Sequence, residues 1–248
     1  MKQWPIVICT KGRPQGKTFK LLEDAGLKYK ALIEPQEWRL YKDHGHSAER
    51  PLNADNQGIA YTRNAALAMA RDNGWDHFWL IDDDVDGFYI ASGGKCKRVQ
   101  ADILLQAQEQ FLEHHFDQAA LEYQQFAWSQ NGTPKLNSYC DVVVALSRRA
   151  AALHRYDASV AMKEDRDFTL QILANGGLTV RSTMFAFSCP SLGKNEGGLH
   201  DDYAARKDED AARRLAAKWP GIVTVQEKKS GRVDAKINWR AFRSAQTQ

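Results

Sequence analysis

Residues 75–88 read W-D-H-F-W-L-I-D-D-D-V-D-G-F, a short apolar run that ends in consecutive aspartates. The run Phe78–Ile81 predicts a buried strand, which would deliver Asp82, Asp83 and Asp84 to one edge of a sheet. Three adjacent carboxylates repel one another unless a cation lies among them, and oxygen ligands suit Mg²⁺ or Mn²⁺ better than zinc. Because side chains alternate along a strand, Asp82 and Asp84 share a face and Asp83 points away. A solvated acidic turn is the alternative interpretation.

The composition favours a single large domain. With 248 residues, of which 43% are hydrophobic, the chain is long enough to bury a full core. It has no apolar stretch of membrane-spanning length and no signal-peptide pattern, so we expect a soluble, cytoplasmic protein with no membrane partner. The 34 Lys and Arg nearly balance the 31 Asp and Glu, so net charge alone excludes no class of partner. Four Cys without metal-ligand spacing favour reduced thiols over structural zinc or disulfides.

The N-terminal residues predict a β-α-β unit. Strands are expected at Trp4–Cys9 and Tyr29–Ile33, with a helix at Gly16–Ala25 between them. The strands of such a unit are parallel, and ligands of open α/β sheets bind at the edge where their carboxyl ends meet. The polar residues that follow these strands should therefore lie in the same crevice as Asp82 and Asp84: Thr10, Arg13 and Glu34.

A polar loop precedes a helix that we expect at Gly58–Asp72, with Arg63 in one of its early turns. A helix N-terminus favours anions, so Arg63 is a candidate contact for a phosphate or a nucleotide. A solvated arginine on the helix surface is the alternative.

The middle of the chain predicts a basic loop, a helix and a hairpin. Lys95–Arg98 is typical of a mobile basic loop, and Ala101–Ala120 predicts a helix. Residues spaced four apart are expected to form the buried stripe of this helix: Ile103, Ala107 and Phe111. Asn131–Gly132 predicts a hairpin turn between strands at Tyr123–Ser129 and Leu136–Leu146.

A second carboxylate centre lies at Lys163–Gly177, K-E-D-R-D-F-T-L-Q-I-L-A-N-G-G. Its apolar spacing and paired glycines predict a helix that begins near Glu164 and Asp165. Acidic residues at a helix entrance can serve only to compensate the helix dipole, which is the alternative to a catalytic role. Further on, a strand at Thr179–Phe187 and a glycine-rich loop precede His200, a candidate ligand because such a loop can close over a bound molecule.

The C-terminal segment is basic and follows a helix expected at Asp202–Lys218. Its cations outnumber Glu227 and Asp234, and Trp239 and Phe242 are interleaved with them: Lys228, Lys229, Arg232, Lys236, Arg240 and Arg243. A nucleic-acid-binding surface needs cations for phosphates and aromatic rings for base stacking. A frayed, solvated tail has the same composition, so both interpretations stay open.

Together these motifs resemble the inverting, nucleotide-sugar-dependent GT-A glycosyltransferases. The similarity runs from the polar residues after the first two strands, through G-I-A-Y-T-R-N-A-A-L and F-W-L-I-D-D-D, to K-E-D-R-D-F-T-L-Q-I-L-A-N-G-G and His200. It implies an α/β protein of GT-A, Rossmann-like architecture, with a mixed, mostly parallel sheet flanked by helices. It also implies one GT-A domain over residues 1–248, in which 1–90 bind the nucleotide sugar, 91–220 form the acceptor and catalytic half, and 221–248 are a basic C-terminal segment.

More narrowly, the I-D-D-D-V form and the compact length resemble the TET-associated glycosyltransferases of bacteriophages, which glycosylate 5-hydroxymethylcytosine in phage DNA. This resemblance implies a metal-dependent hexosyltransferase that moves a sugar from a UDP-sugar to the hydroxyl of that base, in the host cytoplasm if a phage encodes it. The Q-x-x-R-W element of processive polysaccharide synthases is missing. The alternatives are a GT-A enzyme acting on a protein, saccharide or small-molecule acceptor, and a non-catalytic module that binds a nucleotide sugar or DNA.

The family resemblance also assigns roles to single residues. Asp165 maps onto the family's catalytic aspartate and is the expected general base. Asp84 and His200 are expected to bind Mn²⁺ or Mg²⁺, and the basic tail and Lys95–Arg98 to contact DNA phosphates. Uracil and ribose are expected to lie against Thr10, Arg13 and Glu34, and Asp83 is expected to hold the loop. All the remaining candidates are expected to belong to the UDP-sugar site: Thr10, Arg13, Glu34, Arg63, Asp82, Asp83 and Lys194.

Overall fold

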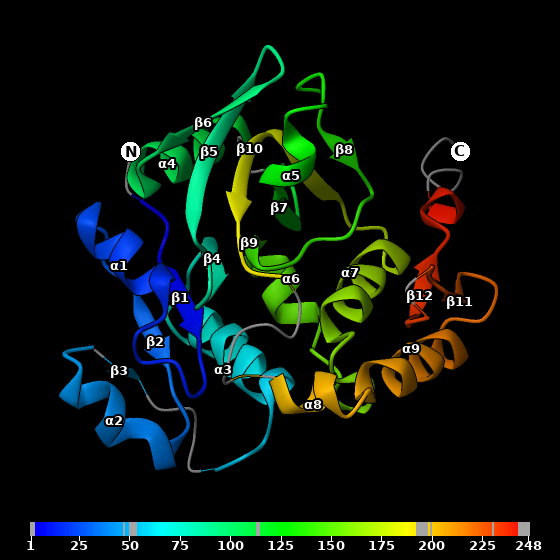
Figure 1. Cartoon of the computed structure of the whole chain (residues 1–248), viewed down its shortest axis with the longest axis horizontal. Helices are drawn as coiled ribbons and strands as arrows, with labels where there is room; N and C mark the ends of the chain where they lie inside the picture. Colours follow the sequence, from blue (N-terminus) through cyan, green and yellow to red (C-terminus); the bar gives the residue numbers. More distant parts are fainter. Residues whose placement is uncertain are drawn as a thin grey trace.

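The chain folds around one ten-stranded sheet (Figure 1). The computed structural model describes residues 3–46, 48–49, 54–112, 115–191, 198, 200–229 and 231–242. The strand order is β3-β2-β1-β4-β9-β7-β10-β5-β6, and β8 pairs with β10 off this path. The predicted fold class is confirmed, since a mixed α/β sheet is flanked by helices.

Four parallel strands form one side of the sheet: β1 (Ile6–Cys9), β2 (Lys30–Leu32), β3 (Ala48–Glu49) and β4 (His77–Asp82). Every residue of β1 is buried, as expected for a strand that is covered on both faces. Cys9 at the end of β1 lies opposite Leu32 of β2 and Asp82 of β4, so the three carboxyl ends are level. The polar residues that follow these strands therefore meet at one edge, as predicted.

The other side of the sheet is largely antiparallel. Its strands are β5 (Gly87–Ser92), β6 (Lys95–Val99), β7 (Gln118–Tyr123), β8 (Lys135–Leu136), β9 (Val143–Ser147) and β10 (Thr179–Ser188). β9 runs antiparallel to β4, with Val143 opposite Ile81. The start of β9 consequently lies at the same edge of the sheet as the end of β4.

Helices cover both faces of the sheet, and the alternation of side chains along β4 divides the core between them. α1 (Lys17–Asp24) and α4 (Ala101–Leu112) pack on the face that Trp79 enters. Phe78 enters the opposite face, which three helices cover: α3 (Ile59–Asp72), α6 (Arg148–Leu153) and α7 (Glu164–Ala174).

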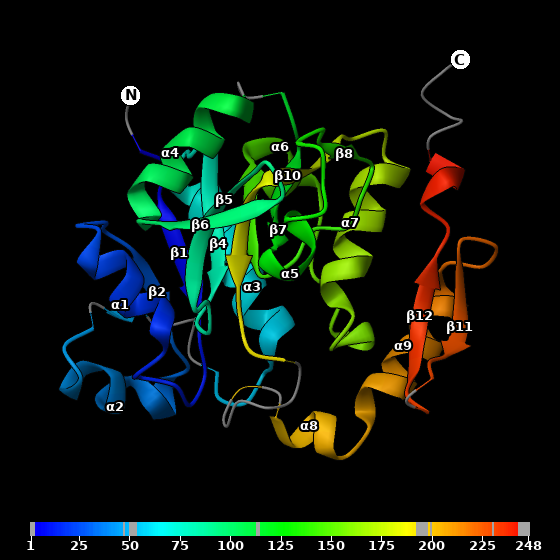
Figure 2. The ribbon, with the colours of Figure 1, turned by 45° about the horizontal axis from the view of Figure 1, so that its top comes forward.

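A small C-terminal unit lies beside α7, apart from the main sheet (Figure 2). It consists of α8 (His200–Ala204), α9 (Lys207–Lys218) and the antiparallel pair β11 (Val223–Glu227) and β12 (Val233–Ile237). Helix and hairpin share a hydrophobic core of their own with α7: Val160, Leu170, Ala212, Leu215, Val223 and Ala235. The basic segment after residue 220 is thus a folded hairpin, and the interpretation as a frayed tail is wrong for its described residues.

Short elements complete the chain: η1 (Pro35–Glu37), α2 (Trp38–Asp43), α5 (Gln124–Ala127), η2 (Ala158–Val160) and η3 (Trp239–Phe242). Among the described residues, no helix has the length and apolar content needed to cross a membrane. All four cysteines are free thiols.

Four predicted elements are wrong. Lys95–Val99 is strand β6, paired with β5, instead of a mobile loop. The predicted helix at 101–120 ends at Leu112, because its last residues enter the sheet as β7. Around Asn131–Gly132, β8 pairs with β10 and β9 pairs with β4 and β7, so these segments do not form the expected hairpin. The helix expected at 202–218 is interrupted at Arg206, which has a φ of 56°.

The buried face of α4 also differs from the predicted stripe. Ile103 and Phe111 are 49% and 42% exposed, whereas polar Glu109 is buried. Oε1 of Glu109 accepts hydrogen bonds from Trp79 Nε1 (2.9 Å) and from the backbone N–H of Trp4 (3.4 Å). Partners far away in the sequence satisfy the hydrogen-bonding capacity of this carboxylate. The face of α4 that carries Glu109 is therefore buried, although the local sequence pattern assigns that face to solvent.

Candidate active site

The predicted site residues converge on one cavity of about 980 Å³, at the edge where β1, β2 and β4 end. Nine of the ten line it: Thr10, Arg13, Glu34, Arg63, Asp82, Asp83, Asp84, Asp165 and His200. The tenth, Lys194, lies outside the described residues. Such a volume is at the upper end of the range for small-molecule sites, which suits a site that takes two substrates.

Asp83 anchors the loop after β1. Its Oδ2 accepts a hydrogen bond from Thr10 Oγ1 (2.5 Å), and its Oδ1 accepts one from Arg13 Nη1 (2.9 Å). The Tyr41 hydroxyl lies 2.7 Å from Thr10 Oγ1 and accepts from the backbone N–H of Arg13 (2.9 Å). Burial raises the pKa of Asp83, and the charge of Arg13 opposes that rise. Asp83, on the opposite face of the chain from Asp82, therefore holds the loop that follows β1.

Glu34 is a buried acceptor in the cavity wall. It accepts hydrogen bonds from the backbone N–H groups of Asn56 and Gln57 (both 3.1 Å), and Lys11 Nζ lies 3.0 Å from its Oε2. Burial alone would raise the pKa of Glu34, but the hydrogen bonds from Lys11 and Gln36 outweigh burial and hold it below its ordinary value. An ionised carboxylate in this position can accept hydrogen bonds from the hydroxyl groups of a ligand.

Arg63 connects the acidic end of β4 to the start of α7. Its Nη2 donates to both carboxylate oxygens of Asp82 (3.0 and 3.2 Å), and its Nη1 donates to Glu164 Oε1 (2.9 Å). Arg63 is buried, so the interpretation as a solvated surface arginine is wrong. Burial raises the pKa of Glu164 to about 7; Arg63 opposes the rise, and the charge of Asp165 adds to it. The sequence analysis placed Glu164 with Asp165 in the second carboxylate centre but assigned it no role in the site.

Asp165 lies in the first turn of α7, half-buried at the cavity. Its Oδ1 accepts a hydrogen bond from the backbone N–H of Arg166 (2.7 Å). Burial lowers the pKa of Arg166, but the charges of Asp165 and Asp234 outweigh burial and raise it. The guanidinium therefore stays charged beside Asp165. A carboxylate in this position can take a proton from a molecule in the cavity.

Asp84 and His200 provide the donor set predicted for a cation. Asp84 is 26% exposed, with Arg13 Nη1 at 3.3 Å, and His200 has a buried Nδ1 that makes no hydrogen bond to the described residues. A buried ring nitrogen without such a partner is suited to binding a metal. Within the described chain, no group of three or more His, Cys, Asp or Glu could hold a metal alone. An ion held by Asp84 and His200 would therefore need further oxygen ligands from a substrate or from water, as Mg²⁺ commonly takes.

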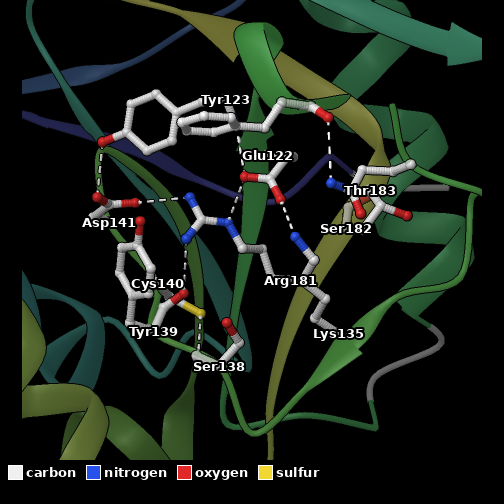
Figure 3. Close-up of polar contacts among 12 residues, drawn as sticks. Glu122, Tyr123, Lys135, Ser138, Tyr139, Cys140, Asp141, Arg181, Ser182 and Thr183 are labelled. Carbon is white, nitrogen blue, oxygen red and sulfur yellow. Dashed lines mark hydrogen bonds and ion pairs between the residues drawn. The ribbon is translucent and has the colours of Figure 1, made fainter. Parts of the chain in front are cut away.

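A second polar network, which the sequence prediction missed, includes three residues that line the cavity, Tyr123, Tyr139 and Asp141 (Figure 3). Oδ2 of Asp141 accepts from the Tyr123 hydroxyl (2.8 Å), and its Oδ1 lies 3.3 Å from Arg181 Nη2. Arg181 is 2% exposed, pairs with Glu122 (3.1 Å) and has its guanidinium carbon 4.3 Å from the centre of the Tyr139 ring. Burial raises the pKa of Asp141, and Arg181 opposes the rise. This network fixes a carboxylate and two aromatic rings at the wall.

Two residues of the cavity lining have a strained backbone. Val142 and Met162 have φ angles of 60° and 70°, and both line the cavity. Positive φ is costly for a bulky or β-branched residue and persists only where the surroundings impose it. The carbonyl of Val142 accepts the backbone N–H of Asp82 (2.9 Å), which fixes the chain directly after Asp141. No periodicity of the sequence predicts such a turn, because Leu136–Leu146 has the apolar content of one continuous strand.

The chain resembles known proteins at two levels. The sequence model of a family described as TET-associated glycosyltransferase matches residues 4–198. Two solved structures match at low identity. A mannose-1-phosphate geranyltransferase from Thermus thermophilus has 10% identity, a TM-score of 0.43 and coverage of 85% of this chain and 79% of its own. An inositol-1-phosphate CTP transferase from T. maritima has 8% identity, a TM-score of 0.45 and coverage of 80% and 94%. No curated protein sequence matches the chain.

Proposed function

The chain belongs to the TET-associated glycosyltransferase family, and we propose that it transfers a sugar from a UDP-sugar to the hydroxyl of 5-hydroxymethylcytosine in DNA. The observation that carries this proposal is that one cavity holds both carboxylate centres, Asp82–Asp84 after β4 and Asp165 at the start of α7. Arg63 bridges the two centres through Asp82 and Glu164. A glycosyl transfer is served by such a juxtaposition, because one centre can hold a cation that stabilises the leaving diphosphate while the other takes the acceptor's proton.

The donor half of the proposed site lies between β1 and β4. Glu34, ionised and held by Lys11, would accept hydrogen bonds from the ribose hydroxyls of a UDP-sugar. Thr10 and Arg13, fixed by Asp83, would form the wall against the uracil ring. We assign no contact to Lys194 beyond the expectation that it meets the diphosphate.

The leaving group requires positive charge near Asp84. Asp84 and His200 would hold a Mg²⁺ or Mn²⁺ ion, which when bound would act as a Lewis acid toward the diphosphate. Asp82 is oriented by Arg63 through both of its oxygens, so it can accept from a ribose hydroxyl or from a water in the same region.

Asp165 would remove the acceptor's proton. In the proposed step, the hydroxymethyl oxygen attacks the anomeric carbon and its proton passes to the Asp165 carboxylate. The bond from the anomeric carbon to the phosphate oxygen breaks, and UDP leaves with the electron pair. One displacement of this kind inverts the anomeric configuration. General-base assistance is typically worth about 10² to 10⁴ in rate.

The test is transfer by the wild type and by Asp165→Asn. Each protein is incubated with UDP-glucose, UDP-galactose or UDP-N-acetylglucosamine, a divalent cation and DNA with or without 5-hydroxymethylcytosine. Nucleosides are then analysed by mass spectrometry, and UDP binding is measured by calorimetry. We expect the wild type to add mass only to the modified base. Asp165→Asn should bind UDP as tightly as the wild type but transfer the sugar at least about 10² times more slowly.

A matched control is Asp24→Asn, an exposed aspartate on α1 that should keep full activity. Equal transfer by Asp165→Asn would refute the role of that carboxylate. If no donor gives a mass gain, the proposal that 5-hydroxymethylcytosine is the acceptor is refuted. Glycosylation of a protein or saccharide instead would favour the alternative class of acceptor.

A further inference from the structure

Four basic side chains line the cavity beside Asp165: Lys163, Arg166, Lys228 and Arg232. Lys163 and Arg166 flank Asp165 at the start of α7, and Lys228 and Arg232 come from the turn between β11 and β12. The hairpin lies beyond residues 4–198, so the family match does not cover half of this cluster. None of the four has a role in the donor site proposed above.

The cluster holds more positive charge than its own acids neutralise. Three of its cations converge on one buried carboxylate, Asp234, with Lys163 Nζ at 3.1 Å, Arg166 Nη1 at 2.9 Å and Lys228 Nζ at 2.8 Å. The fourth, Arg232, pairs with Asp208 at 2.8 Å. Four cations against two carboxylates leave two positive charges, and the neighbouring Asp165 offsets one of them.

The pKa directions agree with this surplus. Burial alone would raise the pKa of Asp234, but Arg166, Lys228 and Lys163 outweigh it and hold the pKa far below its ordinary value. Burial and the charge of Arg166 lower the pKa of Lys163, although that lysine touches Asp234. Burial is the larger of these two causes, and the repulsion between Lys163 and Arg166 adds to it. An additional anion would restore the balance.

We propose that Lys163, Arg166, Lys228 and Arg232 bind a backbone phosphate of the acceptor nucleic acid. This inference rests on the proposed function, because a DNA acceptor brings a phosphate close to any base whose hydroxyl reaches Asp165. Arg guanidinium groups and Lys ammonium groups are the side chains that bind phosphate in proteins. The aromatic ring of Tyr203 lies 5.9 Å from the Arg232 guanidinium carbon and also lines the cavity, where a base or sugar could pack on it.

Binding to unmodified DNA, without donor, tests this site independently of catalysis. Affinity for labelled single-stranded and duplex oligonucleotides is measured by fluorescence anisotropy between about 50 and 200 mM salt. Each phosphate contact contributes roughly 0.7 to 0.9 to the slope of log K against log salt. Lys228→Gln removes one of the four cations and should reduce the slope by up to that amount, which makes the loss of affinity over this range up to roughly threefold smaller.

Lys229→Gln is the matched control. Lys229 is the exposed neighbour of Lys228, carries the same charge and does not line the cavity. Its substitution should change the slope by less than half as much as Lys228→Gln. Equal slope changes for the two variants would overturn the proposal, because they would indicate a diffuse effect of charge.

Asp234→Asn gives a change of opposite sign. It removes the carboxylate that three cations share, so DNA binding should tighten and its salt slope should steepen, with circular dichroism confirming a folded protein. A folded Asp234→Asn protein that binds DNA no better than wild type would overturn the proposal. Weaker UDP binding by Lys228→Gln with unchanged DNA binding would also overturn it, since the cluster would then serve the donor diphosphate. The expected binding changes without any transfer to modified DNA would support the phosphate site and contradict only the proposed reaction.

Discussion

Replacing Glu164 by glutamine should remove a pH-dependent loss of stability. The carboxyl is buried between Arg63 and Asp165, and its pKa is raised from 4.5 to about 7, chiefly by burial. When the folded-state pKa lies above the unfolded value, the folded protein holds the extra proton. The stabilisation is then complete below about pH 4.5 and is lost as pH rises through about 7. A rise from 4.5 to about 7 corresponds to roughly 3 kcal/mol of unfolding free energy.

Glutamine suits this test because it keeps the contact with Arg63. An amide oxygen can still accept from Arg63 Nη1, as Oε1 of Glu164 does at 2.9 Å. The other carboxylate oxygen makes no hydrogen bond within the described residues, so an amide nitrogen there displaces no contact. Any cost of burying that nitrogen is independent of pH and leaves the slope unchanged.

The assay is urea denaturation followed by tryptophan fluorescence at several pH values. From about pH 4.5 to about pH 8, the unfolding free energy of Glu164→Gln should gain up to about 3 kcal/mol on that of the wild type. Glu227→Gln, at an exposed position of β11, should run parallel to the wild type. Parallel curves for Glu164→Gln and the wild type would refute the reasoning, because Glu164 would then titrate alike in the folded and unfolded states.

Three further substitutions test the supports of the site. Thr10→Val removes the hydroxyl that donates to buried Asp83 and should lower stability by about 1–3 kcal/mol; an unchanged melting temperature would contradict this. Val142→Gly relieves a positive φ and should raise stability by about 1 kcal/mol in urea denaturation, whereas a loss would show that the valine side chain contributes more by packing. Trp79→Phe removes a donor from buried Glu109 and should cost about 2 kcal/mol, measured in the same way, and a neutral result would show that Glu109 is satisfied without it.

The parts of the fold that the sequence predicts are those fixed by local patterns of burial. β1 and β4 are short apolar runs covered on both faces, so their ends and the level edge beyond them follow from hydrophobicity and β-α-β geometry. The face of α4 does not follow from such patterns, because Trp4 and Trp79 satisfy Glu109 from distant parts of the chain. The start of β9 also escapes prediction, since a positive φ at Val142 interrupts Leu136–Leu146, which the sequence predicts as one strand.

The three aspartates after β4 have different partners in the fold and therefore different roles. The residue types alone do not reveal these roles. Asp82 has both oxygens on Arg63, and Asp83 has one on Thr10 and one on Arg13. Carboxylates committed in this way orient arginines and a loop, and a metal could use them only by displacing a buried cation, at a cost of roughly several kcal/mol. The Asp84 side chain is as exposed as that of Asp82, at 26%, but its contact with Arg13 is longer, at 3.3 Å, and Arg13 also pairs with Asp83, so a cation can compete for Asp84 at lower cost. The same reasoning favours Asp165 over Glu164 as the base, because Glu164 holds Arg63 while Asp165 lies half-buried at the cavity.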